Sequence, residues 1–214
     1  MAKIDNILAS IVEFYNKSPK KETGTFFKAK PDSFEIGKLL LSFVTFGTNG
    51  NKQINKIDFF VDMKKEGLVL CQDILSGKLN KELELEKKNR LAKDPNSKYS
   101  QPIRVFQGGM SAEKAKEKGI RTDGKAQARI LKISSGTAFP IVFSCEEGPG
   151  RETPEGLIVP TYNGKPDTVI RVGIQNDDLK SFALSVQAHY TAFLSSKYSV
   201  AAFAKEKERR NNAR

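Results

Sequence analysis

The chain has 214 residues, of which 38% are hydrophobic and 29% charged, and it carries a net charge of +11. This composition is typical of a globular protein with a substantial core, and it argues against a membrane protein because no run approaches the ~18 apolar residues that a spanning helix needs. The charge favours a polyanionic partner, either nucleic acid or an anionic membrane face, although a merely soluble basic protein has the same composition.

Residues 4–15 are expected to form an N-terminal amphipathic helix of about four turns, because apolar side chains recur there every three or four positions. These apolar residues are Ile4, Ile7, Leu8, Ile11, Val12 and Tyr15. Asp5 and Glu13 interrupt the pattern and no small-residue cleavage site follows, which argues against a signal peptide. Cys71 and Cys145 are therefore expected to be buried free thiols in a reducing cytoplasm.

Residues 1–24 hold this helix and a linker, and residues 25–77 are expected to form a first unit of three strands and a helix. "TFFKAK" (25–30) and "SFEIGKLLLSFVTFG" (33–47) predict two strands around a Pro31-Asp32 turn. Asn49-Gly50 then predicts a hairpin into the strand "NKIDFFVDM" (55–63). A helix from about Lys65 to Leu75 is expected to end at Gly77.

Residues 78–124 are expected to form a charged insertion or linker between two units. "KLNKELELEKKNRLAKDPNSKYS" (78–100) is highly charged and contains a proline, so it is expected to be exposed and partly helical or mobile. "PIRVFQGG" (102–109) is a candidate strand. "SAEKAKEKG" (111–119) is expected to be a short charged helix with Ser111 as its N-cap.

Residues 125–204 are expected to form a second unit of strands and a helix, followed by a basic tail at 205–214. The strands predicted first are "KAQARILKIS" (125–134), "FPIVFSCEE" (139–147) and "GLIVPTY" (156–162), the last two joined by the loop "GPGRETPE" (148–155). Asn163-Gly164 predicts a tight turn into "TVIRVGIQ" (168–175). A final helix follows, with Leu179, Phe182, Val186, Tyr190, Phe193 and Leu194 on one stripe, and it is expected to continue through "SVAAFAKEKERR" (199–210).

The stretches 57–77 and 168–190 match each other in hydrophobic phase. When Leu68 is paired with Leu179, the strand residues Phe59 and Val61 fall on apolar residues of the second stretch, as does the helical stripe. This favours an internal duplication, although any strand and helix can be aligned in this way, so a coincidence of pattern stays open. The fold class expected is α+β: two antiparallel sheets, each followed by a helix, with the two helices packed together.

Nothing in the sequence predicts a catalytic site, a metal site or a cofactor. The single histidine, His189, has no visible metal-ligand or base partner. The paired glycines of "FQGGM" and "EEGPGRE" lack the continuation of a phosphate-binding loop, so both are interpreted as ordinary loops. An enzyme is therefore the weaker hypothesis.

Strands that mix aromatic and basic residues point instead to single-stranded nucleic acid, whose phosphates bind cations and whose bases stack on flat side chains. The candidate binding residues are Phe26, Phe27, Lys28, Lys30, Arg104, Phe106, Lys125, Arg129, Lys132 and Arg171. Lys28 with Lys30, and Arg129 with Lys132, are favoured because alternate positions on a strand share a face. Arg171 is expected on the face opposite Ile170. The alternative is that each Phe is a core residue and each Lys simply points outward.

The two strand-and-helix units resemble the Whirly-type single-stranded-DNA-binding fold, which is shared with trypanosome guide-RNA-binding proteins and, as one copy per chain, with a family of transcriptional coactivators. "DGKAQARIL" (123–131) is similar to the Lys-Gly-Lys-Ala-Ala-Leu strand motif of the Whirly proteins. The resemblance covers about residues 25–195. It implies central packed helices, sheets that project like blades, a homo-oligomer, and sequence-tolerant binding of single strands.

The expected partner is thus single-stranded DNA, with RNA as the alternative ligand, and no membrane. The expected setting is the cytoplasm, in replication, recombination or DNA transfer of a bacterium, phage or mobile element. An OB-fold single-strand binder and a non-enzymatic phage or plasmid assembly protein are the competing hypotheses. The long C-terminal helix argues against the OB-fold.

Overall fold

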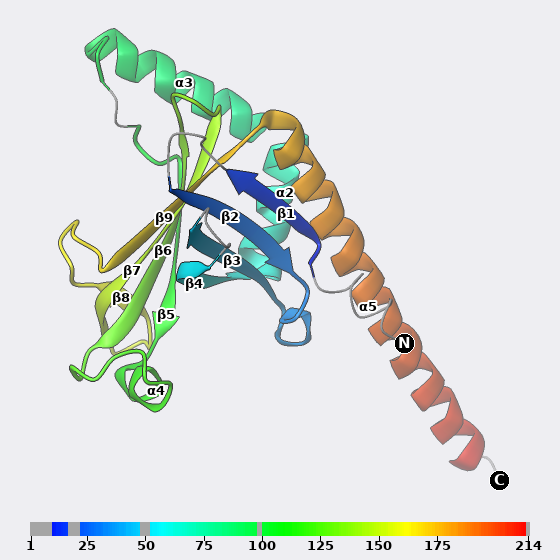
Figure 1. Ribbon diagram of the computed structural model, residues 1–214. Coiled ribbons are helices and arrows are strands. Elements are labelled where there is room, and N and C mark those ends of the chain that lie inside the picture. The colour runs from blue at the N-terminus through cyan, green and yellow to red at the C-terminus, as the bar shows by residue number, and fades with distance from the viewer. Residues whose placement is uncertain (1–9, 17–21, 48–51, 98–99, 213–214) are drawn as a thin grey trace.

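The first sheet is a four-stranded antiparallel meander in which the order of the strands is their order along the chain (Figure 1). Its strands are β1 (Val12–Asn16), β2 (Thr23–Lys30), β3 (Lys38–Gly47) and β4 (Gln53–Asp62). The computed structural model describes residues 10–16, 22–47, 52–97 and 100–212. The turn predicted at Asn49-Gly50 lies outside these residues, but the strands on either side of it pair antiparallel, as a hairpin requires.

The expected N-terminal helix is wrong for its last residues, because Val12–Asn16 form strand β1. Residues 1–9 lie outside the described part. In β1 the apolar Val12 and Phe14 alternate with Glu13 and Tyr15, and the strand pairs along its whole length with β2. The Phe14 ring stacks on the buried Phe27 ring at 6.0 Å. Pairing with a neighbouring strand therefore outweighed the helical spacing, and the first sheet has four strands instead of three.

The strand predicted over residues 33–47 is shorter in the structure. Phe34–Ile36 form a single 3-10 turn after the predicted turn at Pro31-Asp32, and β3 begins only at Lys38. Gly37 ends the 3-10 turn with a φ of 70°, in the left-handed region that favours glycine.

The second sheet repeats this meander and adds a short strand. β5 (Arg104–Met110), β6 (Ala126–Ser135), β7 (Ile141–Glu152) and β9 (Thr168–Ile174) pair antiparallel in that order, while β8 (Ile158–Pro160) pairs with the far end of β7. The second unit thus starts at Arg104, inside the segment expected to be a linker. The loop expected over residues 148–155 is also shorter, because β7 continues to Glu152. The tight turn at Asn163-Gly164 is confirmed, with φ values of 46° and 80°.

Each meander leads into a helix, and the two helices pack together (Figure 1). A π-helical turn (Met63–Gly67) opens the first one, capped by the Asp62 side chain, and α2 (Leu68–Leu75) follows. The chain leaves α2 through Gly77, which has a φ of 74°. The second helix, α5 (Asn176–Asn212), follows β9. The α+β class and two sheets each followed by a helix are therefore confirmed.

The segment after α2 is partly helical, as expected, but it is not simply an exposed insertion. Its helix α3 (Lys78–Lys93) buries Leu79 and Leu83 in the core, and its remaining faces are charged. A shorter helix, α4 (Ala112–Glu117), follows β5, and Ser111 caps it by accepting a hydrogen bond from the amide of Lys114.

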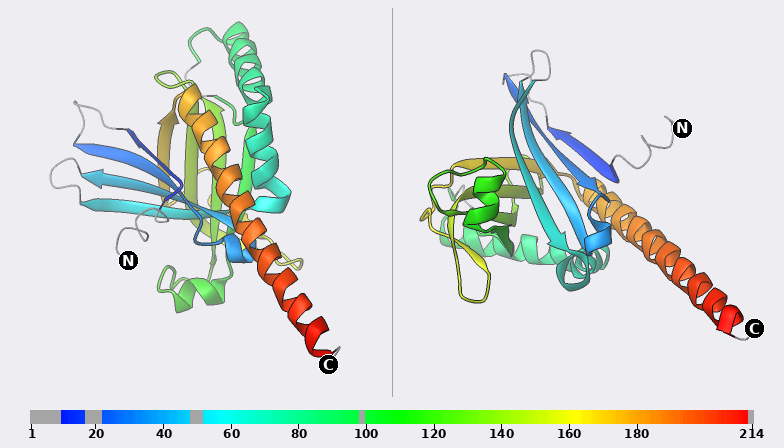
Figure 2. Two further views of the ribbon diagram at one scale, coloured as in Figure 1. Left: turned by 90° about the vertical axis from the view of Figure 1, so that its right-hand side faces the viewer. Right: turned by 90° about the horizontal axis from the view of Figure 1, so that it is seen from below.

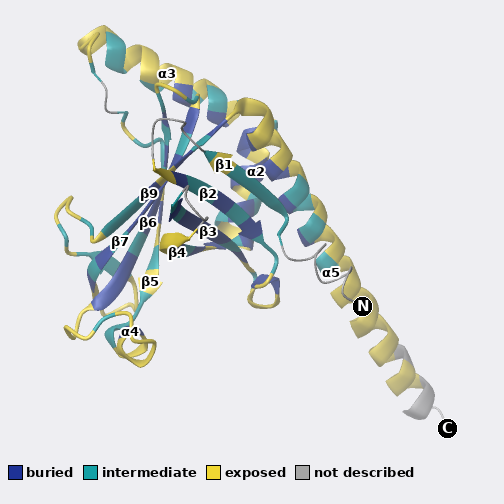
Figure 3. Ribbon diagram, in the orientation of Figure 1, coloured by how far each residue is buried: buried dark blue, intermediate teal, exposed yellow. Residues whose placement is uncertain are grey.

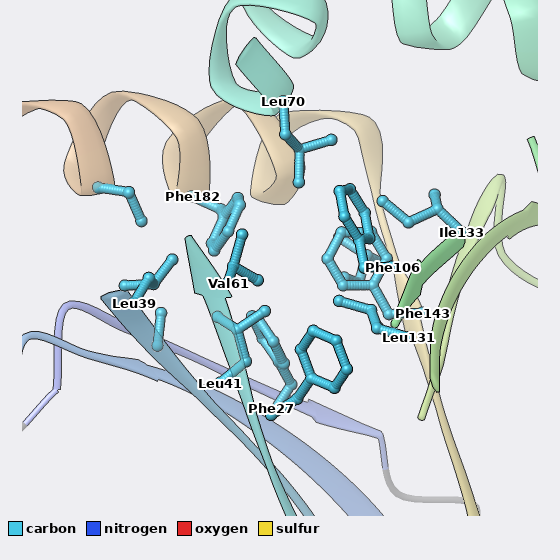
Figure 4. Packing of buried hydrophobic residues seen from close by; sticks show 14 of the residues in the cluster. Phe27, Leu39, Leu41, Val61, Leu70, Phe106, Leu131, Ile133, Phe143 and Phe182 are labelled. Carbon is cyan, nitrogen blue, oxygen red and sulfur yellow. The ribbon is translucent and has the colours of Figure 1, made fainter. Parts of the chain in front are cut away.

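The core lies where the inner faces of the two sheets meet beneath α2 and α5 (Figures 3 and 4). Three rings from different elements meet there: Phe27 of β2, Phe143 of β7 and Phe182 of α5. Their centroids are 5.6 to 6.2 Å apart and all three are essentially inaccessible to solvent. Burying a phenylalanine contributes about 1.5–3 kcal/mol, so this cluster joins both sheets and α5 into one core.

Helix α5 is longer than the body that it packs against. The predicted stripe faces the core: Leu179, Phe182, Val186 and Tyr190 are buried, and Phe193 and Leu194 pack partly buried against the core. Lys197 binds Glu35 at 2.6 Å, and beyond it the helix extends away from the body (Figure 2), where Tyr198 and Phe203 are 73% and 77% exposed. Within the described ranges, no helix combines the length and the apolar character needed to cross a membrane.

Candidate nucleic-acid interface

The face of the first sheet that points away from the core carries both rings and cations. We call it the outer face of the first sheet. In β2, the pleat buries Phe27 and Ala29 and turns Phe26, Lys28 and Lys30 to this face. Its other residues on β1, β3 and β4, by register and alternation, are Glu13, Tyr15, Leu40, Ser42, Val44, Phe46, Lys56, Asp58 and Phe60.

An oblique row of aromatic rings crosses three strands of this face. Tyr15 of β1 lies opposite Phe26 of β2, with ring centroids 5.4 Å apart, and Phe26 lies 5.8 Å from Phe46 of β3. The row grades from exposed to buried, since Tyr15 is 57% exposed, Phe26 is half-buried and Phe46 is buried. Phe60 adds a further exposed ring on β4. Exposed rings on an open sheet are the platform on which unpaired bases stack.

Carboxylates hold two of the three lysines on this face. Lys28 binds Glu13 at 2.7 Å, and its ammonium lies 5.3 Å from the centre of the Phe26 ring. Lys56 likewise binds Asp58 at 2.7 Å. Lys30 makes no ion pair with the described residues. Among the residues that the structure describes, a phosphate approaching the sheet therefore meets one lysine without an ion pair and has to compete with carboxylates for the other two.

Glu13 is the centre of the hydrogen-bonded group at the edge of this face. Its carboxylate accepts hydrogen bonds from Ser10, Tyr15 and Lys28. Burial alone raises the pKa of Glu13, but these three donors outweigh it and lower the pKa to about 2. The hydrogen bond to Glu13 in turn raises the pKa of Tyr15. Glu13 is therefore ionised at neutral pH, and it orients both the first ring of the row and the nearest lysine.

Three of the predicted site residues lie inside the fold. Phe27 and Phe106 are core residues, 0% and 7% exposed, so they cannot stack on bases in the folded protein. Arg104 binds Asp73 at 2.9 Å and Glu82 at 2.6 Å, and thereby ties β5 to α2 and α3. For Phe27 and Phe106 the alternative of a core residue is correct, because the inner face of each sheet is buried against the other sheet and the helices. Arg104 lies on the same inner face, where ion pairs engage it instead of a ligand.

The remaining predicted residues divide between different surfaces. Arg129 and Lys132 do not share a face, because they are three positions apart on β6: Arg129 binds Glu147 on the inner face, and Lys132 binds Glu146 on the outer face. Arg171 is exposed on the outer face of the second sheet, opposite the buried Ile170 and Val172, as predicted. Lys125 is exposed just before β6.

Sequence reasoning missed four residues of the aromatic and basic face: Tyr15, Phe46, Lys56 and Phe60. Tyr15 was assigned to a helix, although its alternation with Val12 and Phe14 was a usable signal. Phe60 stands between the buried Phe59 and Val61, so the pleat alone places it outside. A period of two along β1 and β4 would thus have found this face.

The excess positive charge lies mostly outside the two sheets. Residues 78–124 carry twelve Lys or Arg against seven Asp or Glu, and residues 205–214 carry five against two. On α3, Lys81, Lys87 and Lys88 are exposed. A polyanion is therefore attracted to α3 and the C-terminal end of α5 as well as to the sheets.

The described residues contain no cluster of three or more His, Cys, Asp or Glu side chains that could hold a metal ion. Cys71 and Cys145 are buried free thiols, as predicted. Burial raises the pKa of Cys71 to about 12, and it raises that of Cys145 further, so neither is a thiolate near neutral pH. His189 is half-buried on α5.

Comparison with protein-family models, curated proteins and solved structures gave no match to this chain.

Proposed function

We propose that the protein binds single-stranded DNA with little sequence preference, through the outer face of the first sheet, and that it catalyses no reaction. The observation that carries this proposal is the pair of accessible rings Tyr15 and Phe26, which pack against the buried Phe46, with the Lys28 ammonium over the Phe26 ring. Rings that stand on an open sheet beside cations suit unpaired bases, because every base offers a flat face for stacking.

The energetics favour a weakly specific binder. Each base stacked on an accessible ring contributes about 1–3 kcal/mol, and Tyr15, Phe26 and Phe60 offer rings to a strand on this face. The face has few free donors with which to read base edges, since Glu13 and Asp58 engage Lys28 and Lys56. Affinity therefore comes from stacking and phosphate contacts, which do not depend on the base sequence.

The biological setting follows from this activity and from the Whirly-type resemblance. A protein of this kind protects or organises single strands during replication, recombination or DNA transfer. RNA offers the same phosphates and bases, and it is the alternative ligand. The same resemblance supports a homo-oligomer, and the two buried free thiols suit a reducing cytoplasm as the proposed setting.

The first test is a gel shift with labelled oligo-dT and with a duplex of equal length at two salt concentrations. The wild-type protein is expected to bind oligo-dT more tightly than the duplex, and to lose affinity as salt rises. No binding of oligo-dT at low salt would falsify the proposed function. Degradation of the label in the same gel would show a nuclease and contradict the non-enzymatic part of the proposal.

Matched variants locate the interface. The pair Lys28→Ala and Lys30→Ala is expected to weaken binding of oligo-dT by about tenfold or more, since each lysine contacts a phosphate. Phe26→Leu keeps an apolar side chain but removes the ring, and a similar loss is expected. The control is the pair Lys87→Ala and Lys88→Ala on α3, which makes the same change in charge. If only the control pair weakens binding, α3 is the interface and the sheet is not.

A further inference from the structure

The outer face of the second sheet contains a row of three hydrogen-bond donors that the proposed function does not use. Lys132 of β6 lies opposite Ser144 of β7, and Ser144 lies opposite Arg171 of β9. Directly opposed residues on one face have Cβ atoms about 4.5–5.5 Å apart, so the hydroxyl stands between two cations. We call these three residues the Lys-Ser-Arg row.

The hydroxyl in the middle of the row has no hydrogen-bond partner in the described part of the chain. Ser144 is 6% exposed, and its Oγ atom is buried without a hydrogen bond to any described residue. A buried hydroxyl of this kind is unusual, because its desolvation is left uncompensated. The Ser144 hydroxyl therefore keeps its proton available, and an oxygen atom placed between the two cations could accept it.

A similar row in the first sheet shows what that acceptor looks like. There Lys28 lies opposite Ser42, and Ser42 lies opposite Asp58. The Ser42 hydroxyl is equally buried, but it donates a hydrogen bond of 2.5 Å to the Asp58 carboxylate. In the second sheet the position of the carboxylate is taken by Arg171. In the first sheet Asp58 supplies the anion that Ser42 binds, whereas in the second sheet the cationic Arg171 stands at the corresponding position.

Arg171 is held in position but its charge is free. Thr25 of β2 donates a hydrogen bond of 3.1 Å to the Arg171 carbonyl, and the Asn16 side chain bonds to both backbone groups of Gly173. The backbone of β9 is thus fixed against the first sheet. The exposed Arg171 guanidinium forms no ion pair with the described residues, whereas Lys132 is held by Glu146 at 2.7 Å.

We propose that the Lys-Ser-Arg row binds one phosphate group, and that in the single-stranded complex this is a backbone phosphate of the bound strand. This second clause rests on the proposed function. Arg171 would donate two hydrogen bonds from its guanidinium to phosphate oxygens, and Ser144 would donate its hydroxyl. Lys132 would keep its pair with the buried Glu146 and donate a remaining N–H to the anion. Because the Ser144 Oγ atom is covered, the flanking side chains must rotate to admit the ligand, and Arg171 has no ion pair to hold it back.

β9 packs against the inner face of the first sheet, where Thr25 of β2 contacts the backbone of Arg171. The next residue, Phe26, points to the outer face instead. A strand stacked on the outer face of the first sheet therefore has to continue around the edge of that sheet to reach the Lys-Ser-Arg row. One phosphate contact at this row would extend the path of the strand onto the second sheet.

The site itself is tested with inorganic phosphate by NMR, against chloride at the same ionic strength. Phosphate is expected to shift the amide resonances of Ser144 and Arg171 saturably. Arg171→Gln should abolish the saturable shift at Ser144, while Arg151→Gln, the same change at an exposed position on β7, should retain it. An absence of saturation, or the same response in Arg171→Gln as in the control, overturns the phosphate site.

The strand is tested separately with oligo-dT. Arg171→Gln is expected to weaken binding about tenfold and to lower the salt slope by about 0.7, the value for one phosphate of a single strand, relative to Arg151→Gln. If the two variants have equal affinities and equal salt slopes, the bound strand does not contact the Lys-Ser-Arg row. If wild-type protein ignores oligo-dT but phosphate still saturates Ser144, the proposed function fails and the phosphate site stands.

Ser144→Ala separates a binding role from a structural one. Removing a buried hydroxyl without a partner is expected to leave the unfolding free energy unchanged or to raise it, and yet to weaken phosphate binding by about threefold to tenfold. A variant that is less stable and binds phosphate as the wild type does would show that Ser144 serves packing alone, against the proposal.

Discussion

At the scale of single residues, Glu13 controls the proposed interface. It keeps Lys28 and Tyr15 in place through hydrogen bonds, but it also competes with any phosphate for the Lys28 ammonium. The same carboxylate therefore contributes to stability and opposes binding. Such a conflict between stability and function is common at binding sites.

Replacing Glu13 should reveal both effects. Glu13→Gln is expected to tighten binding of oligo-dT by up to about fivefold at neutral pH, because an exposed ion pair of up to about 1 kcal/mol no longer competes for Lys28. Fluorescence anisotropy at fixed ionic strength measures this change. Asp32→Asn, which removes an exposed carboxylate from the turn after β2, is the charge control. Equal effects of the two substitutions would mean that only net charge matters.

The pH dependence of stability follows from the same residue. The pKa of Glu13 lies at about 2 in the folded protein against an ordinary value of 4.5. Its ionised form therefore stabilises the fold above about pH 4.5, and this contribution is lost as the pH falls toward 2. Urea unfolding of wild-type protein and Glu13→Gln should differ at pH 6 and converge near pH 2. A difference that does not depend on pH would contradict the lowered pKa.

At the scale of elements, α5 divides into a buried half and an exposed half. The stripe up to Tyr190 is in the core, and the residues beyond Lys197 are exposed wherever their side chains are described. The sequence predicted that the helix continues through residues 199–210, but it did not show that this part lies outside the core. Exposed Tyr198 and Phe203 lie in the half without packing.

Truncation should distinguish these halves. A chain that ends at Ser199 is expected to keep its unfolding free energy within about 0.5 kcal/mol, since the removed residues are exposed. A chain that ends at Ala188 also loses the buried Tyr190 and its contact with Phe34 at 5.0 Å, and a loss of about 3 kcal/mol or more is expected. Urea denaturation measures both. A large loss on the first truncation would show that the exposed half of α5 supports the fold.

At the scale of the whole molecule, the two sheets are joined by the core and by a polar clamp. Asn16 of β1 donates to the Gly173 carbonyl of β9 at 3.0 Å and accepts from its amide, although the two residues are 157 positions apart. This side chain satisfies both backbone groups of a residue in the other sheet. It also helps to fix β9, which carries Arg171 of the Lys-Ser-Arg row, against the inner face of the first sheet.

Breaking the clamp should loosen the contact between β9 and the first sheet. Asn16→Ala leaves both Gly173 groups unpaired and is expected to lower the unfolding free energy by about 1–3 kcal/mol. Asn55→Ala on the exposed end of β4 is the control and should change it by less than about 0.5 kcal/mol. Hydrogen exchange at the Gly173 amide should quicken only in the first variant. Unchanged exchange there would show that the clamp is not needed.

Much of this fold could be predicted because its signals are local. Alternation of apolar and polar residues predicts the strands β2, β6 and β9, and apolar spacing at the helical period predicts the stripe of α5. The candidate site was harder to predict, since Phe26 and Phe27 are adjacent in sequence but point to opposite faces of the sheet. The pleat separates the two rings, but only contact with Phe143 and Phe182 decides which face becomes the core.

The sequence by itself determined the class of the protein: an α+β fold with two strand-and-helix units and a polyanion-attracting charge. Periodicity and composition are properties of the chain and need no partner. Only the tertiary structure decided that residues 12–16 are a strand, that Arg104 and Arg129 serve internal ion pairs, and that Ser144 lies between two cations without a hydrogen bond to any described residue. These facts depend on which strands become neighbours, and that choice is made by contacts between residues distant in the chain.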